Sequence, residues 1–282
     1  MFGGEDVGDT GTIELSSLDG DNGFVINGID VYDFSGISVS GVGDINGDGV
    51  ADLIIGAYGA DLNGNIAAGE SYVVFGGAGV GNTGTIELSS LDGSDGFVIN
   101  GIDEGDRSGR SVSGAGDING DGVADLIIGA VYADPNGNSS AGESYVVFGG
   151  AGTGSTGALE LSSLDGSDGF VINGIDEDDR SGRSVSGAGD INGDGVADLI
   201  IGANRADPNG NDDAGESYVV FGGVLTGSTG TVELSSLDGS DGFVINGIDG
   251  SDLSGISVSG ACLLYTSPSP RDRTRSRMPS SA

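Results

Sequence analysis

The sequence predicts an all-β protein built as a β-propeller of four-stranded blades, and three observations lead to this prediction. The chain of 282 residues repeats itself, because DINGDGVADLIIGA begins at Asp44, Asp117 and Asp190, a spacing of 73 residues. Such a fixed period is typical of repeat architectures. Short runs rich in Val, Ile, Phe and Tyr alternate with Asp-Gly, Asn-Gly and Gly-Gly steps, as strands and hairpin turns require. No stretch has a helical period over a useful length.

Each repeat contains four candidate strands, which in the first repeat are residues 24–29, 36–40, 52–57 and 71–75. The third is apolar on both faces, so we expect it to be buried between neighbouring sheets. A solenoid is the competing architecture, but its repeats usually have about 20 to 50 residues. Closed propellers have roughly 4 to 8 blades. Three full repeats plus partial ones therefore predict a fragment of a longer protein.

Both ends of the sequence are expected to be artificial. Met1 stands where the other copies of the repeat have Val before Phe-Gly-Gly, which suggests a start inside a longer reading frame. Back-translated, residues 262–272 resemble a sequencing-library adapter. We therefore assign residues 1–261 to the propeller and leave residues 262–282 out of it, the alternative being a natural disordered tail. A secretion signal is expected to lie outside this fragment.

The composition is strongly acidic. Asp and Glu total 44 against 9 basic residues, all of them Arg, and the net charge is −35. Nucleic acids and anionic membranes would be repelled, so neither is an expected partner. No apolar stretch approaches the ~18 residues of a membrane span, so no membrane insertion is expected. Self-repulsion opposes folding of such a chain and predicts bound cations.

The residue types also limit the chemistry. The chain has no His, Lys or Trp and one Cys, which excludes Ser-His-Asp and Cys-His catalysis, His-ligated zinc and CxxC redox sites. Carboxylate pairs such as Asp178 with Asp179, or Glu104 with Asp106, are the remaining acid and base candidates. Almost every polar group recurs three or four times, whereas a catalytic site is built once. The sequence therefore predicts that the protein is not an enzyme.

The strongest functional motif is D-x-N-x-D-G-x-x-D, present once in each full repeat. Positions 1, 3 and 5 turn side-chain oxygens inward, Gly at position 6 permits a sharp turn, and position 7 offers its carbonyl, as in an EF-hand loop. We expect Asp at position 9 to close the shell, because Ile occupies position 12. The predicted ligands are Asp44, Asn46, Asp48, Val50 and Asp52 in the first repeat, Asp117, Asn119, Asp121, Val123 and Asp125 in the second, and Asp190, Asn192, Asp194, Val196 and Asp198 in the third.

Calcium is the cation that these loops predict. Carboxylates ~5 Å apart repel by about 3 kcal/mol per pair at an effective dielectric constant of ~20, which a divalent cation offsets. Oxygen ligands on a flexible loop favour Ca²⁺ over Mg²⁺. We expect about three Ca²⁺, one in each complete loop. The alternative is a set of plain Asp, Asn and Gly turns with solvated charges.

These residues resemble the FG-GAP repeats of integrin α-chain-like propellers, especially those of secreted bacterial proteins. The resemblance rests on SGISVSGVGDINGDGVADLIIGA, its two further copies and the YVVFGG that follows. It implies a propeller of about seven blades, calcium in the loop between the first and second strands, and an extracellular adhesive or recognition role. The departures are at the Phe of FG, where Ser35, Ser108 and Ser181 stand, and at the Pro of GAP, where Tyr58, Val131 and Asn204 stand.

Together these features predict a calcium-binding extracellular or cell-surface module for adhesion or for recognition of a protein or glycan. The alternatives are an accessory non-catalytic domain of a larger secreted enzyme, and a structural spacer of a giant surface protein. Specificity is expected where the loops differ between copies. Two basic pairs, Arg107 with Arg110 and Arg180 with Arg183, are expected to offset nearby carboxylates, the alternative being an anionic ligand.

Overall fold

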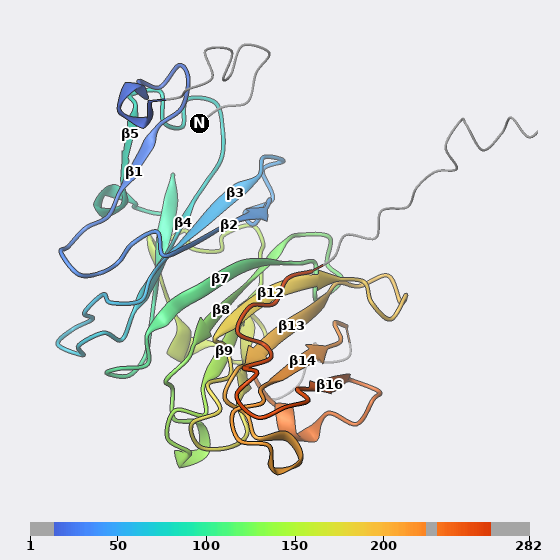
Figure 1. The fold of residues 1–282 in the computed structure, drawn as a ribbon. Helices are drawn as coiled ribbons and strands as arrows, with labels where there is room; N and C mark the ends of the chain where they lie inside the picture. The colour runs from blue at the N-terminus through green and yellow to red at the C-terminus, as the bar shows by residue number, and fades with distance from the viewer. Residues whose placement is uncertain (1–13, 224–229, 261–282) are drawn as a thin grey trace, which may run out of the picture.

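The computed structural model describes residues 14–223 and 230–260 (Figure 1). Met1 and residues 262–282, whose origin was considered above, lie outside these ranges. Within them, β-strands are joined by turns and by 3-10 helices of three residues each, and there is no α-helix. None of the described segments is a helix with the length and apolar character that crossing a bilayer requires.

Three antiparallel sheets repeat the same design, so the all-β class and the four-stranded blades of a propeller are confirmed. Within a sheet the strands follow one another in sequence order from one edge. The blades are β2 (Ser38–Gly43), β3 (Asp52–Ala57), β4 (Glu70–Val74) and β6 (Gly96–Asn100); β7 (Ser108–Gly116), β8 (Asp125–Ala130), β9 (Glu143–Val147) and β11 (Gly169–Asn173); and β12 (Ser184–Gly189), β13 (Asp198–Ala203), β14 (Glu216–Val220) and β16 (Gly242–Asn246).

The blades do not coincide with the repeat as the sequence suggested it. The strand expected at residues 24–29 forms β1 (Val25–Asn27), but it belongs to a different sheet from β2 and pairs with β5 (Thr85–Glu87). The outer strand of each complete blade comes instead from the next copy of the repeat. After the outer strand of one blade, such as β6, the chain crosses to the inner strand of the next blade, such as β7.

A short parallel strand ties each blade to the following one. β10 (Ala158–Glu160) extends the outer edge of β6, and β15 (Thr231–Glu233) extends that of β11. Asn100 Nδ2 donates to Glu160 Oε1 at 2.6 Å, and the pair Asn173–Glu233 repeats the contact at 2.8 Å. The outer edge is therefore paired, which protects it from association with other chains.

The hydrophobic core lies between successive blades. Inner strands β2, β7 and β12 contact one another in turn, as strands around a propeller axis do (Figure 1). One core cluster joins Ile54 and Val73 of one blade to Leu126 and Ile128 of the next. Leu126, Ile127 and Ile128 of β8 have no exposed surface. The expected burial of this strand on both faces is thus confirmed in the second blade, whereas Leu53 of β3 in the first blade is 38% exposed.

Glycine in the second strand of each blade allows this close packing. A Cβ on Gly56 would lie 2.0 Å from the carbonyl oxygen of Gly109 in the next blade. The same approach occurs between Gly129 and Gly182 at 2.1 Å. Since real Cβ atoms do not approach a carbonyl this closely, the blades meet through backbone where glycine stands.

We predict that Gly56→Ala destabilises the fold by about 1–3 kcal/mol, because the added methyl group forces the two blades apart. Gly41→Ala is the matched control, since a Cβ there meets nothing within 4 Å. Urea unfolding followed by circular dichroism measures both. Equal stability of the two variants would contradict blade packing through Gly56.

Candidate metal centre

Each D-x-N-x-D-G loop joins the first and second strands of a blade, after a β-bulge. The register of β2 and β3 shifts between Gly41 and Gly43, and Gly43 has a φ of 77°. A bulge of this kind bends the strand and ends regular pairing. The same shift occurs between Gly114 and Gly116 and between Gly187 and Gly189. The loop therefore follows the same bulge in all three copies.

The loop wraps around its first carboxylate. Asp44 Oδ1 accepts hydrogen bonds from the backbone N–H groups of Gly47 at 2.8 Å and Asp48 at 3.0 Å. Asp44 Oδ2 accepts from the N–H of Gly49 at 2.7 Å. Gly47 and Gly49 have φ values of 80° and 90°, which glycine adopts readily. The loops that begin at Asp117 and Asp190 repeat all three bonds.

The oxygens at positions 3, 5 and 7 lie along the same turn. Asp48 donates its backbone N–H to Asn46 Oδ1 at 2.9 Å, and Asn46 Nδ2 donates to Asp48 Oδ2 at 3.3 Å. Val50 donates its N–H to Asp48 Oδ1 at 2.8 Å. The carbonyl oxygen of Val50 accepts no hydrogen bond from another described residue. The atoms at these positions that could bind a cation are all oxygens, from carboxylate, amide and carbonyl groups, which fits a hard divalent cation such as Ca²⁺.

Asp at position 9 has a structural role that the sequence did not reveal. Asp52 is 1% exposed, and its carboxylate accepts N–H hydrogen bonds from Ile45 at 2.9 Å and from Gly76 at 2.7 Å. It thereby clamps the loop to the end of β4. Burial raises the pKa of Asp52, and the charges of Asp48 and Asp44 raise it further. Direct contact of this carboxylate with a cation stays a prediction.

The same burial raises the pKa of Asp125, the second-copy equivalent of Asp52, to about 7. Hydrogen bonds from Gly149 and Ile118 act in the opposite direction, and the charges of Asp121 and Asp117 add to the rise. Across the described ranges, no three His, Cys, Asp or Glu side chains meet in a group that could hold a metal ion. The loop carboxylates are turned toward their own backbone amides.

The loops also belong to the contact between blades. The N–H groups of Ala124 and Gly150 donate to the carbonyl oxygens of Asp44 at 3.3 Å and Ile45 at 2.8 Å. Ile45 is fully buried in the cluster that it shares with the next blade. Ile191, its equivalent in the third loop, is 47% exposed. The first two loops are thus each fixed by the blade that follows, whereas the third is not covered in this way within the described residues.

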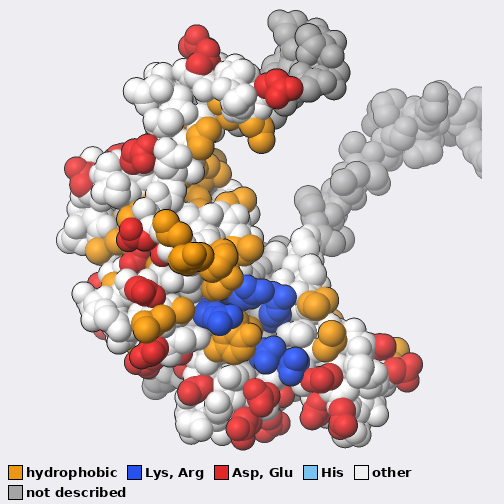
Figure 2. Space-filling model, turned by 60° about the vertical axis from the view of Figure 1, so that its left-hand side comes forward, with side chains coloured by type: hydrophobic (Ala, Val, Ile, Leu, Met, Phe, Trp, Pro, Cys, Tyr) orange, Lys and Arg blue, Asp and Glu red, His pale blue; other side chains and the backbone are white. Residues whose placement is uncertain are grey.

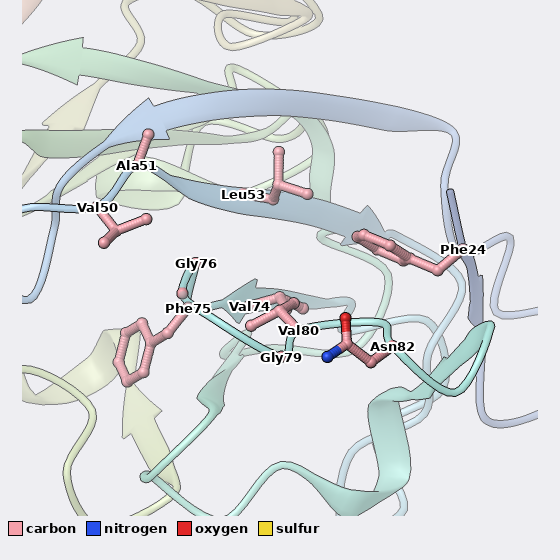
Figure 3. A pocket seen from close by; sticks show the side chains of 11 residues that line it. Phe24, Val50, Ala51, Leu53, Val74, Phe75, Gly76, Gly79, Val80 and Asn82 are labelled. Carbon is pink, nitrogen blue, oxygen red and sulfur yellow. The ribbon is translucent and has the colours of Figure 1, made fainter. Parts of the chain in front are cut away.

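An apolar pocket of about 380 Å³ lies beside the first loop (Figure 3). Val50, Ala51 and Gly76 line one side of it, and Phe24 and Val80 line another. In the second blade, the residues equivalent to Ala51 and Gly77 receive the loop of the preceding blade through the two hydrogen bonds just described. The pocket therefore occupies the position that receives the preceding loop in the second blade.

Another pocket, which is acidic and has a volume of about 330 Å³, contains Glu104 and Asp106, one of the two carboxylate pairs considered as acid and base. It is lined by Asp103, Asp106, Glu143 and Tyr145, among others. Tyr145 donates its hydroxyl to Glu143, and burial raises the pKa of Glu143. The third blade repeats the Tyr–Glu contact. Repetition indicates that this arrangement belongs to the blade architecture.

Tandem four-stranded blades, each with an oxygen-rich loop after its first strand, define a repeat β-propeller. The family model for the FG-GAP repeat matches residues 35–74, 108–147 and 181–220, which contain all three loops and strands one to three of each complete blade. The chain therefore contains three FG-GAP repeats and is similar to integrin α-like repeat proteins.

Three curated relatives support this family assignment. Integrin alpha-PS2 of Drosophila melanogaster is 29% identical over 66% of this chain and 12% of its own length. Phosphatidylinositol-glycan-specific phospholipase D of Bos taurus is 30% identical over 57% of this chain and 17% of its own. Integrin alpha-5 of Xenopus laevis is 29% identical over 65% and 17%. The chain thus matches less than a fifth of each relative.

We predict that Asp106→Asn stabilises the protein more at pH 8 than at pH 5. Burial raises the pKa of Asp106 from 3.8 to about 7. The native state therefore binds more protons than the unfolded state between these values. The contribution of this group to stability is greatest at acidic pH and is lost as the pH rises through 7. Asparagine has no ionised form, so the variant does not lose this stability as the pH rises.

Urea midpoints at the two pH values measure this effect, with Asp92→Asn as the control. Asp92 is fully exposed and its pKa is lowered by hydrogen bonds from Ser94. An Asp106→Asn effect of the same size at pH 5 and pH 8 would show that the carboxylate is ionised throughout.

Proposed function

We propose that this chain is a calcium-stabilised recognition module that acts outside the cell or at its surface and binds a partner protein or glycan without catalysis. The observation that carries the proposal is the position of three equivalent oxygen-rich loops, two of which are docked on the following blade by hydrogen bonds from Ala124 and Ala197. A cation in such a loop would stabilise the contact between blades. Residues 1–261 would form the module and residues 262–282 would lie outside it.

The charges of the loops support calcium binding. Asp44, Asp48 and Asp52 occupy one loop, and the first two raise the pKa of the third. At separations of ~5 Å and an effective dielectric constant of ~20, each carboxylate pair costs about 3 kcal/mol. A hard divalent cation supplies positive charge that offsets this repulsion. The side chains of Asp44, Asn46 and Asp48, with the carbonyl of Val50, would hold it.

Two of the relatives are integrin alpha chains, which supports a role in adhesion or recognition for these repeats. The Tyr–Glu contact and the oxygen-rich loops each recur from blade to blade, which favours a repeated binding role over a single catalytic site. The charge of −35 disfavours nucleic acid as the partner.

An accessory domain of a larger secreted enzyme is the second candidate. The similarity to a phospholipase D favours it over a purely structural spacer. The repeats would then bind a ligand or surface for a catalytic domain located elsewhere in the longer protein.

We predict that the full chain binds about three Ca²⁺ in a calorimetric titration and binds Mg²⁺ more weakly. The titration must reach about 10⁻⁴ to 10⁻³ M, the range of extracellular calcium modules. The triple variant Asp48→Ala, Asp121→Ala and Asp194→Ala removes one carboxylate from each loop and is expected to lose tight binding. Full uptake by this variant would show that the loops are not the calcium sites.

The matched control is the triple variant Asp92→Ala, Asp165→Ala and Asp238→Ala. It removes the same three charges at exposed positions with the same spacing of 73 residues, where each carboxylate bonds only a neighbouring serine. It is expected to retain the binding stoichiometry. A loss of binding in the control as well would indicate a general charge effect.

We also predict that Ca²⁺ raises the melting temperature. Binding at 100 times the dissociation constant stabilises the folded state by about 2.7 kcal/mol per site. Differential scanning calorimetry with Ca²⁺ and with a chelator measures the shift. The loop variant is expected to melt at the same temperature in both, and a calcium-dependent shift that persists in it would contradict the assignment.

A further inference from the structure

Four arginines and two tyrosines gather on the face of the blades that lies opposite the calcium loops. Strands β3 and β8 run away from those loops, so Tyr58 and Tyr132, which follow them, lie at the opposite end. The start of β7 and the segments that lead into β7 and β12 carry the arginines and contact the two tyrosines at this end. Figure 2 shows the basic side chains together, beside hydrophobic side chains and with acidic side chains around them. We name Arg107, Arg110, Arg180, Arg183, Tyr58 and Tyr132 the arginine–tyrosine cluster.

The rings and guanidinium groups contact one another across blades. The Arg107 guanidinium lies 4.8 Å from the ring centroid of Tyr132 and 5.8 Å from that of Tyr58. Arg110 lies 4.9 Å from the Tyr58 ring, and Arg180 lies 5.0 Å from the Tyr132 ring. These are cation–π distances, and such contacts hold the guanidinium groups in place.

No carboxylate neutralises these arginines. Within the described ranges, none of the four side chains forms an ion pair or donates a hydrogen bond, and Arg180 Nε is buried without a partner. Burial and the charges of Arg110 and Arg180 lower the pKa of Arg183. Among the residues that the structure describes, the arginines thus form no ion pair with the carboxylates that they were expected to offset. Their neighbour Asp106 instead accepts the backbone N–H of Asp103 at 3.2 Å.

The backbone conformation at one position recurs in every copy of the repeat, but only two copies carry arginine there. Phe34, Arg107, Arg180 and Leu253 are equivalent and all have positive φ, between 54° and 60°. Bulky side chains rarely adopt this conformation, and it persists only where surrounding structure fixes it. The N–H of Arg107 donates to Ala67 O at 3.1 Å, and the other blade junctions repeat this bond. The backbone thus presents whichever side chain the copy carries.

We propose that the arginine–tyrosine cluster binds a carboxylate of an acidic peptide segment on a partner protein. A guanidinium group can donate two parallel hydrogen bonds to a carboxylate in one plane. The four arginine side chains of the cluster donate no hydrogen bond to the described residues, so their N–H groups can bind a ligand. The net charge of −35 repels long polyanions, so the anion is carried singly on a partner that is not itself polyanionic.

The surroundings of the cluster define the partner further. Phe34 stacks on Tyr58 with ring centroids 5.1 Å apart and is 52% exposed. Ile37, the equivalent of Arg110, is 54% exposed. The segment therefore presents an aromatic or aliphatic residue beside its acidic one. This inference rests on the proposed recognition function, but it does not require calcium in the loops.

The test is a titration of the full chain, in saturating Ca²⁺, with acetyl-Asp-Phe-amide and with acetyl-Asn-Phe-amide. NMR signals of the arginine Nε–H groups report the binding. The aspartyl peptide is expected to bind about tenfold more tightly, as one charge-assisted contact implies. The variant Arg107→Gln/Arg180→Gln keeps the backbone and is expected to lose this preference. Asp92→Asn, at an exposed carboxylate outside the cluster, is expected to keep it.

Several outcomes would overturn the proposal. Equal affinity for the two peptides would show that the cluster does not read a carboxylate, and a preference that persists in Arg107→Gln/Arg180→Gln would place the anion elsewhere. Tight binding of a heparin hexasaccharide without the peptide preference would identify a polyanionic glycan instead. Calcium calorimetry on the same variants separates these results from failure of the loops, because the arginine variants are expected to bind calcium normally.

Discussion

The close backbone contact between successive blades is the constraint on which the rest of this structure depends. At Gly56 and Gly129 the next blade comes so near that no side chain fits. Ile45 and Ile118 of the two docked loops are buried in the cores that they share with the following blades. A chain with 44 acidic and 9 basic residues would resist such packing through self-repulsion. Its acidic residues therefore need to lie where cations, backbone amides or protonation relieve the repulsion.

The three loops link charge to packing. Asp44 is surrounded by the amides of its own loop, while Asp52 is buried and clamps the loop to the end of β4. The loop's carbonyl groups accept hydrogen bonds from the following blade, so any ion that orders the loop also orders the junction. On the opposite face, the same junctions present Arg107 and Arg180 from a strained backbone. One architecture thus separates a candidate cation site from a candidate anion site.

Much of the fold was predictable from the sequence, because the 73-residue repeat marks the strands and the position of the loop between them. The strand expected at 52–57 occurs as β3 with the same bounds. The sequence did not reveal the parallel strand β10, since three residues carry too little pattern, or the division of a blade between two copies of the repeat. The clamp made by Asp52 and the burial of Arg180 Nε without a hydrogen-bond partner depend on contacts between segments that no local sequence pattern shows.

Hydrogen exchange of single amides, with and without Ca²⁺, tests most directly whether the loops join calcium to blade docking. The N–H groups of Ala124 and Gly150 donate to the first loop across the junction, whereas that of Ile127 lies within a core strand. The account predicts that Ca²⁺ slows exchange at Ala124 and Gly150 by at least about tenfold and changes Ile127 much less. Unchanged exchange at both junction amides in saturating Ca²⁺ would contradict it.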